Sequence, residues 1–390
     1  MADERVQEDG ARLGEAAEVM TRVAACLLLA ACGDDVARPT PIRFLHTFGP
    51  EETELFNAVM LERGIAVDSS LVPFARGQQV IREILVAAKD CPDVVRIDAT
   101  WLPGLVAAQL LAAAPAALAG LDWTPEAAAL VRGVPQFAIP QTVDGLMVIR
   151  DESRPAPASP ALDALVVAAR ATRTATTQYP LGVRVDGYWF VPWLRAEGGE
   201  LAAASIADPG AVRALAKFAG LFGDVAPPPP PAGSEAPDEL RRWQDHEMAY
   251  WVTGPWQVGA LAERDRLQVT ALAHAPRGGQ LLVVPKCARH PDDGWRLARE
   301  LTDVAVAHRL AESFATIPTR KAALDASPPL VRAMYGALAS AEPLPRTPET
   351  PLLFDDLNPA LAAAVAHDAT PEEAIAGVRH GWQRLAKGAR

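Results

Sequence analysis

Asp93-Val-Val-Arg-Ile-Asp98 is a short, mostly apolar run of the kind that forms a strand buried in a parallel sheet. Two more strands are predicted upstream of it, at 41–46 and 66–71. A helical pattern follows each of the three strands, beginning near Pro50 and covering 77–89 and 101–111. Because strands and helices alternate, the sequence predicts an α/β layered fold.

The rest of the chain continues the mixture of strands and helices. Strand-like runs occupy 137–140 and 145–150, and Pro-rich stretches at 154–160 and 227–231 are predicted as loops. Helices are expected at 160–174, 208–222, 292–310 and 371–387. No internal repeat of fixed period is present, so the fold is not a solenoid or a propeller.

Length and charge narrow the class of protein. A chain of 390 residues makes two or three domain-sized units or one large two-lobed body. Half of the residues are hydrophobic, which is enough for a sizeable core. The net charge of −11, without Lys/Arg clusters, argues against nucleic acid or an anionic membrane surface as a partner. No apolar run reaches the roughly 18 residues of an ordinary membrane-spanning helix.

A secretory signal is predicted near the N-terminus. Arg22 precedes the apolar stretch 23–31, and small residues end that stretch. Leu29-Ala-Ala-Cys32 resembles the bacterial lipobox, which implies that Cys32 is lipidated and becomes the mature N-terminus. Residues 1–40 would then be a signal peptide, lipobox and tether, and the protein would be extracytoplasmic and lipid-anchored to a bacterial membrane. The alternative interpretation is a short buried helix.

The first nineteen residues do not fit a signal peptide, because they carry six acidic residues. Met20-Thr-Arg22 is the start that the signal needs. We therefore expect translation to begin at Met20. A peptide from residues 6–12 in the unprocessed precursor would contradict this.

Two cysteines, Cys91 and Cys287, remain in the mature body. An oxidising compartment would permit a disulfide between them. No spacing rule supports the pairing, however, and two buried free thiols are the preferred prediction.

A search for catalytic motifs finds none. The chain has no phosphate-binding loop, no dinucleotide-binding glycine pattern and no nucleophile elbow. His246-Glu247 is not completed into a zinc-binding helix, since Tyr250 stands where the second His would be. Acidic pairs such as Asp292-Asp293 are interpreted as caps and solvated faces. The sequence therefore predicts no enzyme, no metal and no cofactor.

Aromatic residues suggest a binding cleft instead. Nine Trp stand against four Tyr, and several lie where a loop meets an element: Thr100-Trp101, Asp186-Gly-Tyr-Trp189 and Thr253-Gly-Pro-Trp256. Flat sugar faces stack on aromatic rings while neighbouring Asp, Glu and Arg bind the hydroxyls, so this combination favours carbohydrate. For any single Trp, an ordinary place in the core is the competing interpretation.

Several blocks in order carry a resemblance to a known family, the substrate-binding proteins of ABC importers in the maltose/trehalose-binding group. The blocks are Ile42–Gly49, Pro92–Trp101 with 108–111, Asp144-Gly-Leu146, Tyr188-Trp-Phe190 with 198–200, Thr253-Gly-Pro-Trp256, Ile317-Pro-Thr-Arg320, 358–361 and 370–374. Together they span almost the whole mature chain.

The resemblance implies a two-lobed periplasmic-binding-protein fold of type II. Its discontinuous lobes are joined by crossing strands, and they are expected at 41–143 plus 275–315 and at 144–274 plus 316–390. The family closes its lobes around a solute and delivers it to a membrane permease. The implied partners are a small-molecule sugar and ABC permease subunits, and the protein is expected to be monomeric.

The resemblance also implies a set of ligand-binding residues. The first lobe would supply Thr47, Glu51, Asp98 and Trp101, with Asp144 at the crossing between lobes. Tyr188, Trp189, Gly254 and Trp256 would come from the second lobe, and Gly279 and Arg320 from segments that reach the cleft in relatives. Competing roles remain open: Glu51 and Asp98 can stabilise helix N-termini, and Trp189 with Trp193 can form one packed helix face.

The sequence departs from the family pattern at three places, so the resemblance does not determine which solute is bound. Thr253 replaces the usual Asn, 248–251 is unusually aromatic, and the loop 226–237 is Pro-rich. The first hypothesis is an oligosaccharide-binding lipoprotein of an importer. The alternatives are the same fold with a polyamine, phosphate ester or metal chelate as solute, an enzyme on the same scaffold, and a non-transporting sensor lipoprotein.

Overall fold

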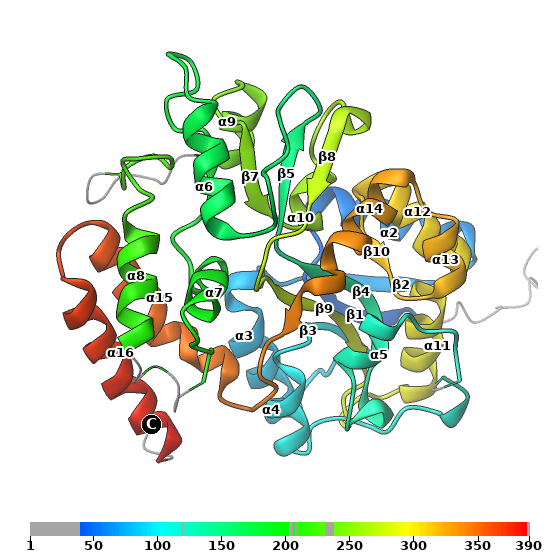
Figure 1. The fold of residues 1–390 in the computed structure, drawn as a ribbon. Helices are drawn as coiled ribbons and strands as arrows, with labels where there is room; N and C mark the ends of the chain where they lie inside the picture. Colours follow the sequence, from blue (N-terminus) through cyan, green and yellow to red (C-terminus); the bar gives the residue numbers. More distant parts are fainter. Residues whose placement is uncertain (1–39, 119, 203–205, 207–208, 231–237, 388–390) are drawn as a thin grey trace, which may run out of the picture. The chain divides into compact units, whose positions relative to one another are not determined.

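A computed structural model describes residues 40–118, 120–202, 206, 209–230 and 238–387. The predictions made for the leader, including the start at Met20 and the lipidation of Cys32, lie outside the described residues. The body that begins at Ile42 contains two β-sheets with helices packed around them (Figure 1).

The larger sheet has seven strands in the order β10-β4-β9-β3-β1-β2, with β11 pairing β9. Its members are β1 (Ile42–His46), β2 (Val67–Leu71), β3 (Val94–Asp98), β4 (Ile139–Gly145), β9 (Pro276–Val283), β10 (Ile317–Pro318) and β11 (Glu342–Pro343). The strands β2, β1 and β3 are mutually parallel, whereas β9 runs antiparallel to both β3 and β4. The predicted parallel core is therefore present, and strands from later in the chain extend it.

The smaller sheet has four strands in the order β6-β7-β5-β8. They are β5 (Met147–Asp151), β6 (Leu181–Gly182), β7 (Tyr250–Thr253) and β8 (Leu267–Thr270). In β7 all four residues are buried, and β5 and β6 flank its two edges.

Helices begin at or near most of the positions predicted from the sequence. Those of the first half are α2 (Pro50–Glu62), α3 (Phe74–Ala87), α4 (Leu102–Ala107), α5 (Pro125–Leu130), α6 (Leu162–Ala171) and α7 (Gly187–Ala196). Those of the second half are α8 (Pro209–Ala219), α9 (Glu239–Gln244), α10 (Pro255–Val258), α11 (Pro291–Leu301), α12 (Val304–Phe314), α13 (Lys321–Asp325), α14 (Pro329–Ala337), α15 (Leu353–Val365) and α16 (Pro371–Ala386). Helices α8, α15 and α16 pack against one another (Figure 1).

One predicted helix is wrong in its extent. The single helix expected at 292–310 is broken into α11 and α12. Asp303 explains the break, because its side chain accepts a hydrogen bond from the backbone N–H of Ala305 and so caps a new helix.

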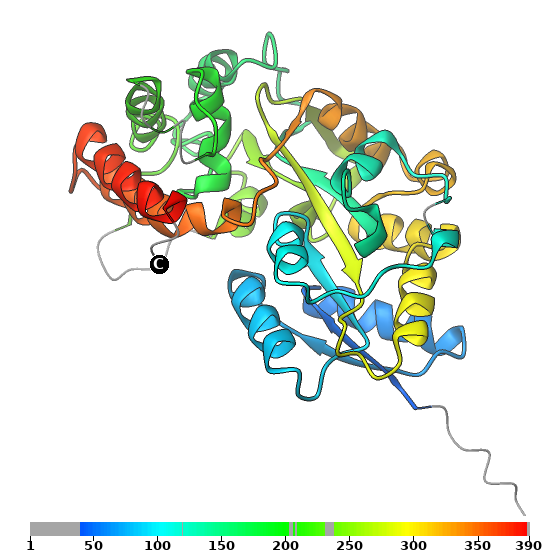
Figure 2. The ribbon, with the colours of Figure 1, turned by 90° about the horizontal axis from the view of Figure 1, so that it is seen from below.

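Strands cross between the two sheets, as the fold class predicts. β4 of the larger sheet leads through Leu146 directly into β5 of the smaller one, and β8 returns to β9 (Figure 2). Gly145 lies at the first crossing, where a methyl group would come within 2.7 Å of the Pro276 carbonyl oxygen. Only glycine permits this close approach of the two crossing segments.

The segment after residue 316 was expected to lie wholly in the second lobe, but its short strands pair elsewhere. β10 and β11 hydrogen-bond within the larger sheet, although 316–390 was assigned to the second lobe. The physical reason is local: β10 pairs antiparallel with β4, and the hydroxyl of Thr319 donates to the Pro140 carbonyl at 2.8 Å. The other lobe bounds stay a prediction.

The prediction of free thiols is wrong, since Cys91 and Cys287 form a disulfide with Cα atoms 5.8 Å apart. The antiparallel register of β3 and β9 pairs Val95 with Val283. Continuing that register beyond the strand ends brings Cys91 opposite Cys287. A long-range pairing of strands therefore places the two cysteines together, and their spacing in sequence carries no sign of it.

Loss of this disulfide is expected to destabilise the body. The bond joins residues 196 apart in sequence, so it strongly restricts the unfolded chain. The double variant Cys91→Ala, Cys287→Ala should lose roughly 2–5 kcal/mol in free energy of unfolding, measured by denaturant titration. A reductant should destabilise the parent chain and leave the double variant unchanged. Equal stability of the two proteins would contradict the prediction.

Candidate functional site

Three adjacent strands of the larger sheet bring two carboxyl groups and an amide to one face. Asp98 ends β3, Asp144 lies near the end of β4, and Gln280 lies on β9 between them. The register pairs Asp98 with Gln280, and Gln280 with Thr142, which is two residues before Asp144. Since side chains two residues apart share a face, these three groups converge. We call Asp98, Asp144 and Gln280 the acidic floor.

Hydrogen bonds within the floor fix the position of Asp98. Oδ1 of Asp98 accepts the backbone N–H of Thr100 at 2.8 Å and the Thr100 hydroxyl at 2.5 Å. Nε2 of Gln280 donates to Oδ2 of Asp98 at 3.4 Å. Burial nevertheless raises the pKa of Asp98, and the hydrogen bonds from Thr100 act against that rise.

Asp144 is the more strongly perturbed carboxyl group. Burial first, and then the negative charge of Asp98, raise the pKa of Asp144 to about 7. A hydrogen bond from Gln280 and the charge of Arg96 act in the opposite direction without offsetting the rise. Strongly shifted carboxyl groups are typical of functional sites, because burial of this kind costs stability.

Arg96 lies beside the floor on β3 and was not among the residues predicted for the site. The residue is 7% exposed. Its guanidinium donates to Oε1 of Gln141 and Oγ1 of Thr47 at 2.7 Å each, and lies 4.6 Å from the centroid of the Phe48 ring. Thr47 therefore belongs to the surroundings of the site through Arg96. Arg96 and Asp98 are two residues apart on one strand, so their side chains lie on the same face of the sheet. This spacing is the feature of the sequence that could have identified Arg96.

An aromatic group stands next to the floor. Tyr188 and Trp189 begin α7, and Trp256 lies in the first turn of α10. The ring centroids are 5.9–6.3 Å apart, and all three pairs meet edge to face. We call Tyr188, Trp189 and Trp256 the aromatic wall.

The members of the wall differ in exposure. Trp189 is 7% exposed, and its indole N–H donates to the Val252 carbonyl at 2.7 Å, so it supports the wall from behind. Trp256 is 43% exposed and offers its ring to solvent. An exposed tryptophan braced by buried aromatic rings is suited to stacking against a ligand.

Tyr188 connects the wall to the floor. Its hydroxyl donates to the Pro276 carbonyl at 3.3 Å. Burial, followed by the charges of Asp144 and Asp98, raises the pKa of Tyr188 well above its ordinary value, so the hydroxyl stays protonated. A methyl group at Gly278 would lie 2.9 Å from Asp144 Oδ1 and 3.7 Å from the Tyr188 oxygen, which places these two groups side by side.

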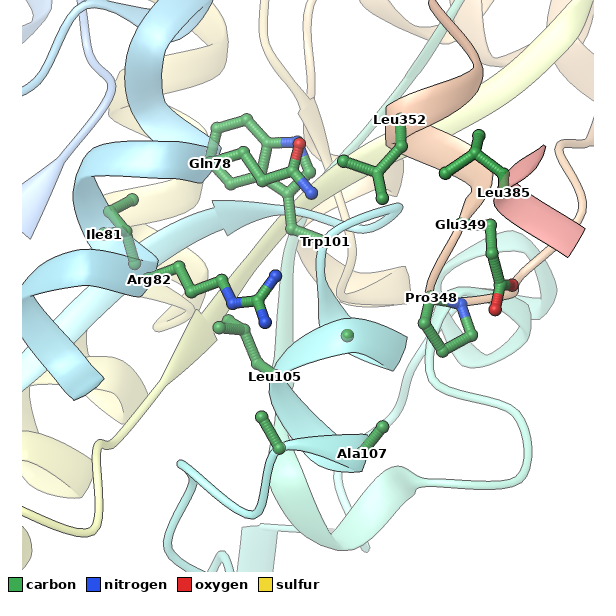
Figure 3. A pocket seen from close by; sticks show the side chains of 12 residues that line it. Gln78, Ile81, Arg82, Trp101, Leu105, Ala107, Pro348, Glu349, Leu352 and Leu385 are labelled. Atoms are coloured by element: carbon green, nitrogen blue, oxygen red, sulfur yellow. The ribbon is translucent and has the colours of Figure 1, made fainter. Parts of the chain in front are cut away.

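Trp101 lies at the edge of a cavity of about 400 Å³. It is also close to Thr47, since a methyl group at Gly77 would lie within 3.5 Å of both side chains. The cavity is bounded by Gln78 and Arg82 of α3 on one side and by residues 348–352 on the other (Figure 3). The Trp101 ring lies 5.3 Å from that of Phe74, which is 54% exposed and was missed by the sequence analysis. A methyl group at Gly77 would lie 2.6 Å from the edge of the Trp101 indole, so α3 needs glycine there.

Two predicted glycines have packing roles in the structure. Gly254 precedes α10, and a methyl group there would overlap the indole of Trp256. Gly279 lies on β9 against the Thr142 carbonyl of β4, with no room for a side chain. Gly278, one residue earlier, is the glycine beside Asp144.

Two predicted charged residues are engaged away from the floor and the wall. Glu51 is exposed in the first turn of α2, whereas its neighbour Glu52 accepts the Gly49 N–H at 2.8 Å and acts electrostatically on Arg96. Arg320 pairs with Asp122 and lies 5.8 Å from the Trp123 ring. The structure thus brings together Thr47, Asp98, Asp144, Tyr188, Trp189 and Trp256, and leaves Glu51 and Arg320 with other contacts.

The described residues form neither a metal site nor a membrane-spanning helix. Across 40–387, apart from the gaps given above, no three His, Cys, Asp or Glu side chains gather as a metal site. Over the same residues, no helix is both long and apolar enough to span a membrane.

The shifted pKa of Asp144 predicts a pH-dependent stability. The folded-state pKa is about 7, above the value near 3.8 of an unfolded aspartate, so the folded protein binds the extra proton. Stability from this group is complete below about pH 4 and is lost as the pH rises through about 7, by roughly 4 kcal/mol. Asp144→Asn should therefore gain stability relative to the parent chain as the pH rises over that window.

Denaturant unfolding of both proteins at several pH values measures this difference. Asp68→Asn, which changes an exposed aspartate on β2, serves as the matched control and should follow the parent curve. Parallel curves for Asp144→Asn and the parent would show that the carboxyl group is not destabilised by burial.

Comparisons of sequence and of structure give different results. No family model and no curated protein sequence matches the chain. Solved structures do match. The GacH receptor of Streptomyces glaucescens, solved unliganded and with acarbose, has a TM-score of 0.77 at 22% identity, covering 90% of this chain and 99% of that one.

Maltose-bound MalE3 of T. maritima gives a TM-score of 0.76 at 21% identity, covering 88% of this chain and 99% of that one. MalE of Bdellovibrio bacteriovorus, bound to maltotriose, gives 0.77 at 13% identity, covering 89% and 100%. With sequence identity this low, the likeness establishes the fold. The chain has the two-lobed α/β fold of these sugar-bound binding proteins.

Proposed function

We propose that this protein is the solute-binding lipoprotein of an ABC sugar importer and that it captures an oligosaccharide between its two lobes. The observation that carries the proposal is the aromatic wall beside the acidic floor. The fold supports it, since similar structures were solved with acarbose, maltose and maltotriose.

Recognition of a sugar follows from the two chemistries of the site. The apolar face of a pyranose ring stacks on the exposed indole of Trp256, which the buried Trp189 holds in place. Sugar hydroxyls donate to the carboxyl oxygens of Asp98 and Asp144. The wall thus supplies affinity and the floor supplies orientation, as in most small-molecule sites.

Capture requires the lobes to move relative to each other. The crossings β4–β5 and β8–β9 are narrow connections, and Gly145 lies in the first of them. Hinge closure occurs by rotation at a few such residues while each sheet remains intact. The closed, loaded form then docks on a membrane permease, and the protein itself carries out no chemical step.

The location is proposed on two grounds. The leader pattern ending in Cys32 predicts export and lipid anchoring. The Cys91–Cys287 disulfide supports an oxidising compartment, where such bonds persist. The proposal therefore places a monomer outside the cytoplasmic membrane, next to its permease.

Ligand-induced stabilisation tests the proposal. A sugar at about 100 times its dissociation constant should add roughly 2.7 kcal/mol to the free energy of unfolding, seen as a rise of several degrees in Tm. Trp256→Ala should abolish that rise, because it removes the exposed ring. Leu61→Ala, which truncates another exposed apolar side chain on α2, should keep it. No rise with any mono- or oligosaccharide would contradict the proposal.

Gly77 offers a test that separates binding from stability. Gly77→Ala should push the Trp101 indole out of place, so affinity for the sugar should fall several-fold by calorimetry. Gly336→Ala is the matched control: Gly336 is also helical, and nothing lies within 4 Å of the added methyl group. The control should be stabilised by roughly 0.5–1 kcal/mol with unchanged affinity. Equal affinity of both variants would remove Trp101 from the site.

A further inference from the structure

The acidic floor carries more negative charge than its surroundings balance. Glu52, Asp144 and Asp98 all act electrostatically on a single guanidinium, that of Arg96. Among the described residues, neither Asp98 nor Asp144 has a Lys, Arg or His nitrogen within the 4.0 Å of an ion pair. One cation thus faces three carboxyl groups, without direct contact to the two in the floor.

Arg96 is held by other contacts. Its Nε donates to Gln141, one terminal nitrogen donates to Thr47, and its plane lies over Phe48. These contacts fix the guanidinium to the side of the floor, so it cannot neutralise both carboxyl groups.

The other arginines near the wall are also engaged. Arg195 pairs with Glu200 and donates to the carbonyls of Glu342 and Pro343. Arg184 pairs with Glu239, and Arg277 lies 3.9 Å from Glu126. Asp186, which caps α7 through the N–H of Tyr188, adds a further carboxyl group on this side.

A second and independent observation is the amide of Gln280. The residue is 7% exposed, and its Nε2 donates to Asp98 within the floor. Its other end, Oε1, is buried and has no hydrogen-bond partner. This carbonyl oxygen therefore adds an acceptor without a donor to two carboxyl groups without an ion-pair partner, and a buried acceptor left without a donor costs free energy.

The aromatic wall is suited to the same kind of ligand. Aromatic faces attract cations, and the Arg184 guanidinium already lies 5.0 Å from the centroid of the Trp189 ring. Tyr188 joins the floor to Trp256, whose ring is open to solvent. A ligand group between floor and wall would meet negative charge on one side and aromatic rings on the other.

We infer that the solute is a cationic, amine-bearing sugar, whose ammonium group binds between Asp98 and Asp144 while its ring stacks on Trp256. This inference rests on the proposed function and names its substrate class. An ammonium supplies a positive charge and a donor in direct contact with the two partly buried carboxyl groups, whereas a neutral sugar leaves both without a counter-charge.

Calorimetry of the full chain with matched ligand pairs tests the inference. The pairs are α- and β-linked glucose disaccharides and their 2-amino-2-deoxy counterparts, with the N-acetylated forms and spermidine alongside. One amino sugar should bind about tenfold or more tightly than its neutral counterpart, and N-acetylation should remove the preference. The preference should also fall as salt concentration rises.

Variants of the floor locate the effect. Asp144→Asn and, separately, Asp98→Asn should bring the amino and neutral forms to within about twofold of each other, while Asp68→Asn keeps the preference. At about pH 6, binding of the amino sugar should release protons from Asp144, as measured in buffers of different ionisation enthalpy.

The outcomes separate the two proposals. Equal or tighter binding of the neutral sugar overturns the cationic inference and leaves the proposed function intact. Binding of spermidine without any sugar overturns both, in favour of a polyamine-binding protein. Absence of binding by every sugar and by spermidine also overturns both.

Discussion

The antiparallel pairing of β4 with β9 is the contact on which the site and the fold both depend. Residue 279 is glycine, so the backbone of β9 can lie directly against the Thr142 carbonyl of β4. That approach sets the register that brings Gln280 between Asp98 and Asp144. The same two strands also form the crossings to the smaller sheet. β4 continues through Leu146 into β5, and the chain returns from β8 into β9. A side chain at 279 would therefore disturb the floor and the crossings together.

The acidic floor lowers the stability of the folded protein, because the packing around it keeps its carboxyl groups away from water. Burial raises the pKa of both carboxyl groups, and the negative charge of Asp98 raises that of Asp144 further. Hydrophobic residues at these positions would fold more easily, since buried charge without a partner opposes folding. Retaining such a cluster beside an exposed tryptophan is the pattern expected when a site is organised for a ligand rather than for stability.

Local sequence patterns predicted the parts of the structure that local physics controls. The apolar runs at 42–46 and 94–98 form strands, and Pro50 and Pro371 begin helices as expected. Asp98 and Asp144 could be proposed from the resemblance to the substrate-binding proteins, which assigns the end of the third strand and the crossing between lobes to the ligand site. What the sequence could not show depended on contacts between distant segments: the partner of Cys91, the packing of Gly254 and Gly279, and the ion pair of Arg320 with Asp122. Close approach of backbones leaves no periodicity for sequence analysis to detect.

The order of strands in the larger sheet has a consequence for how the chain is made. β3 has β1 as a neighbour from its own part of the sequence, but its other neighbour, β9, begins at Pro276. During synthesis the sheet therefore stays open at β3 until more than two thirds of the chain has emerged, and the cross-link between β3 and β9 must wait equally long. Late, long-range closure makes folding slow. The N-terminal strands β1, β2 and β3 therefore exist before the partner that closes their sheet has been made.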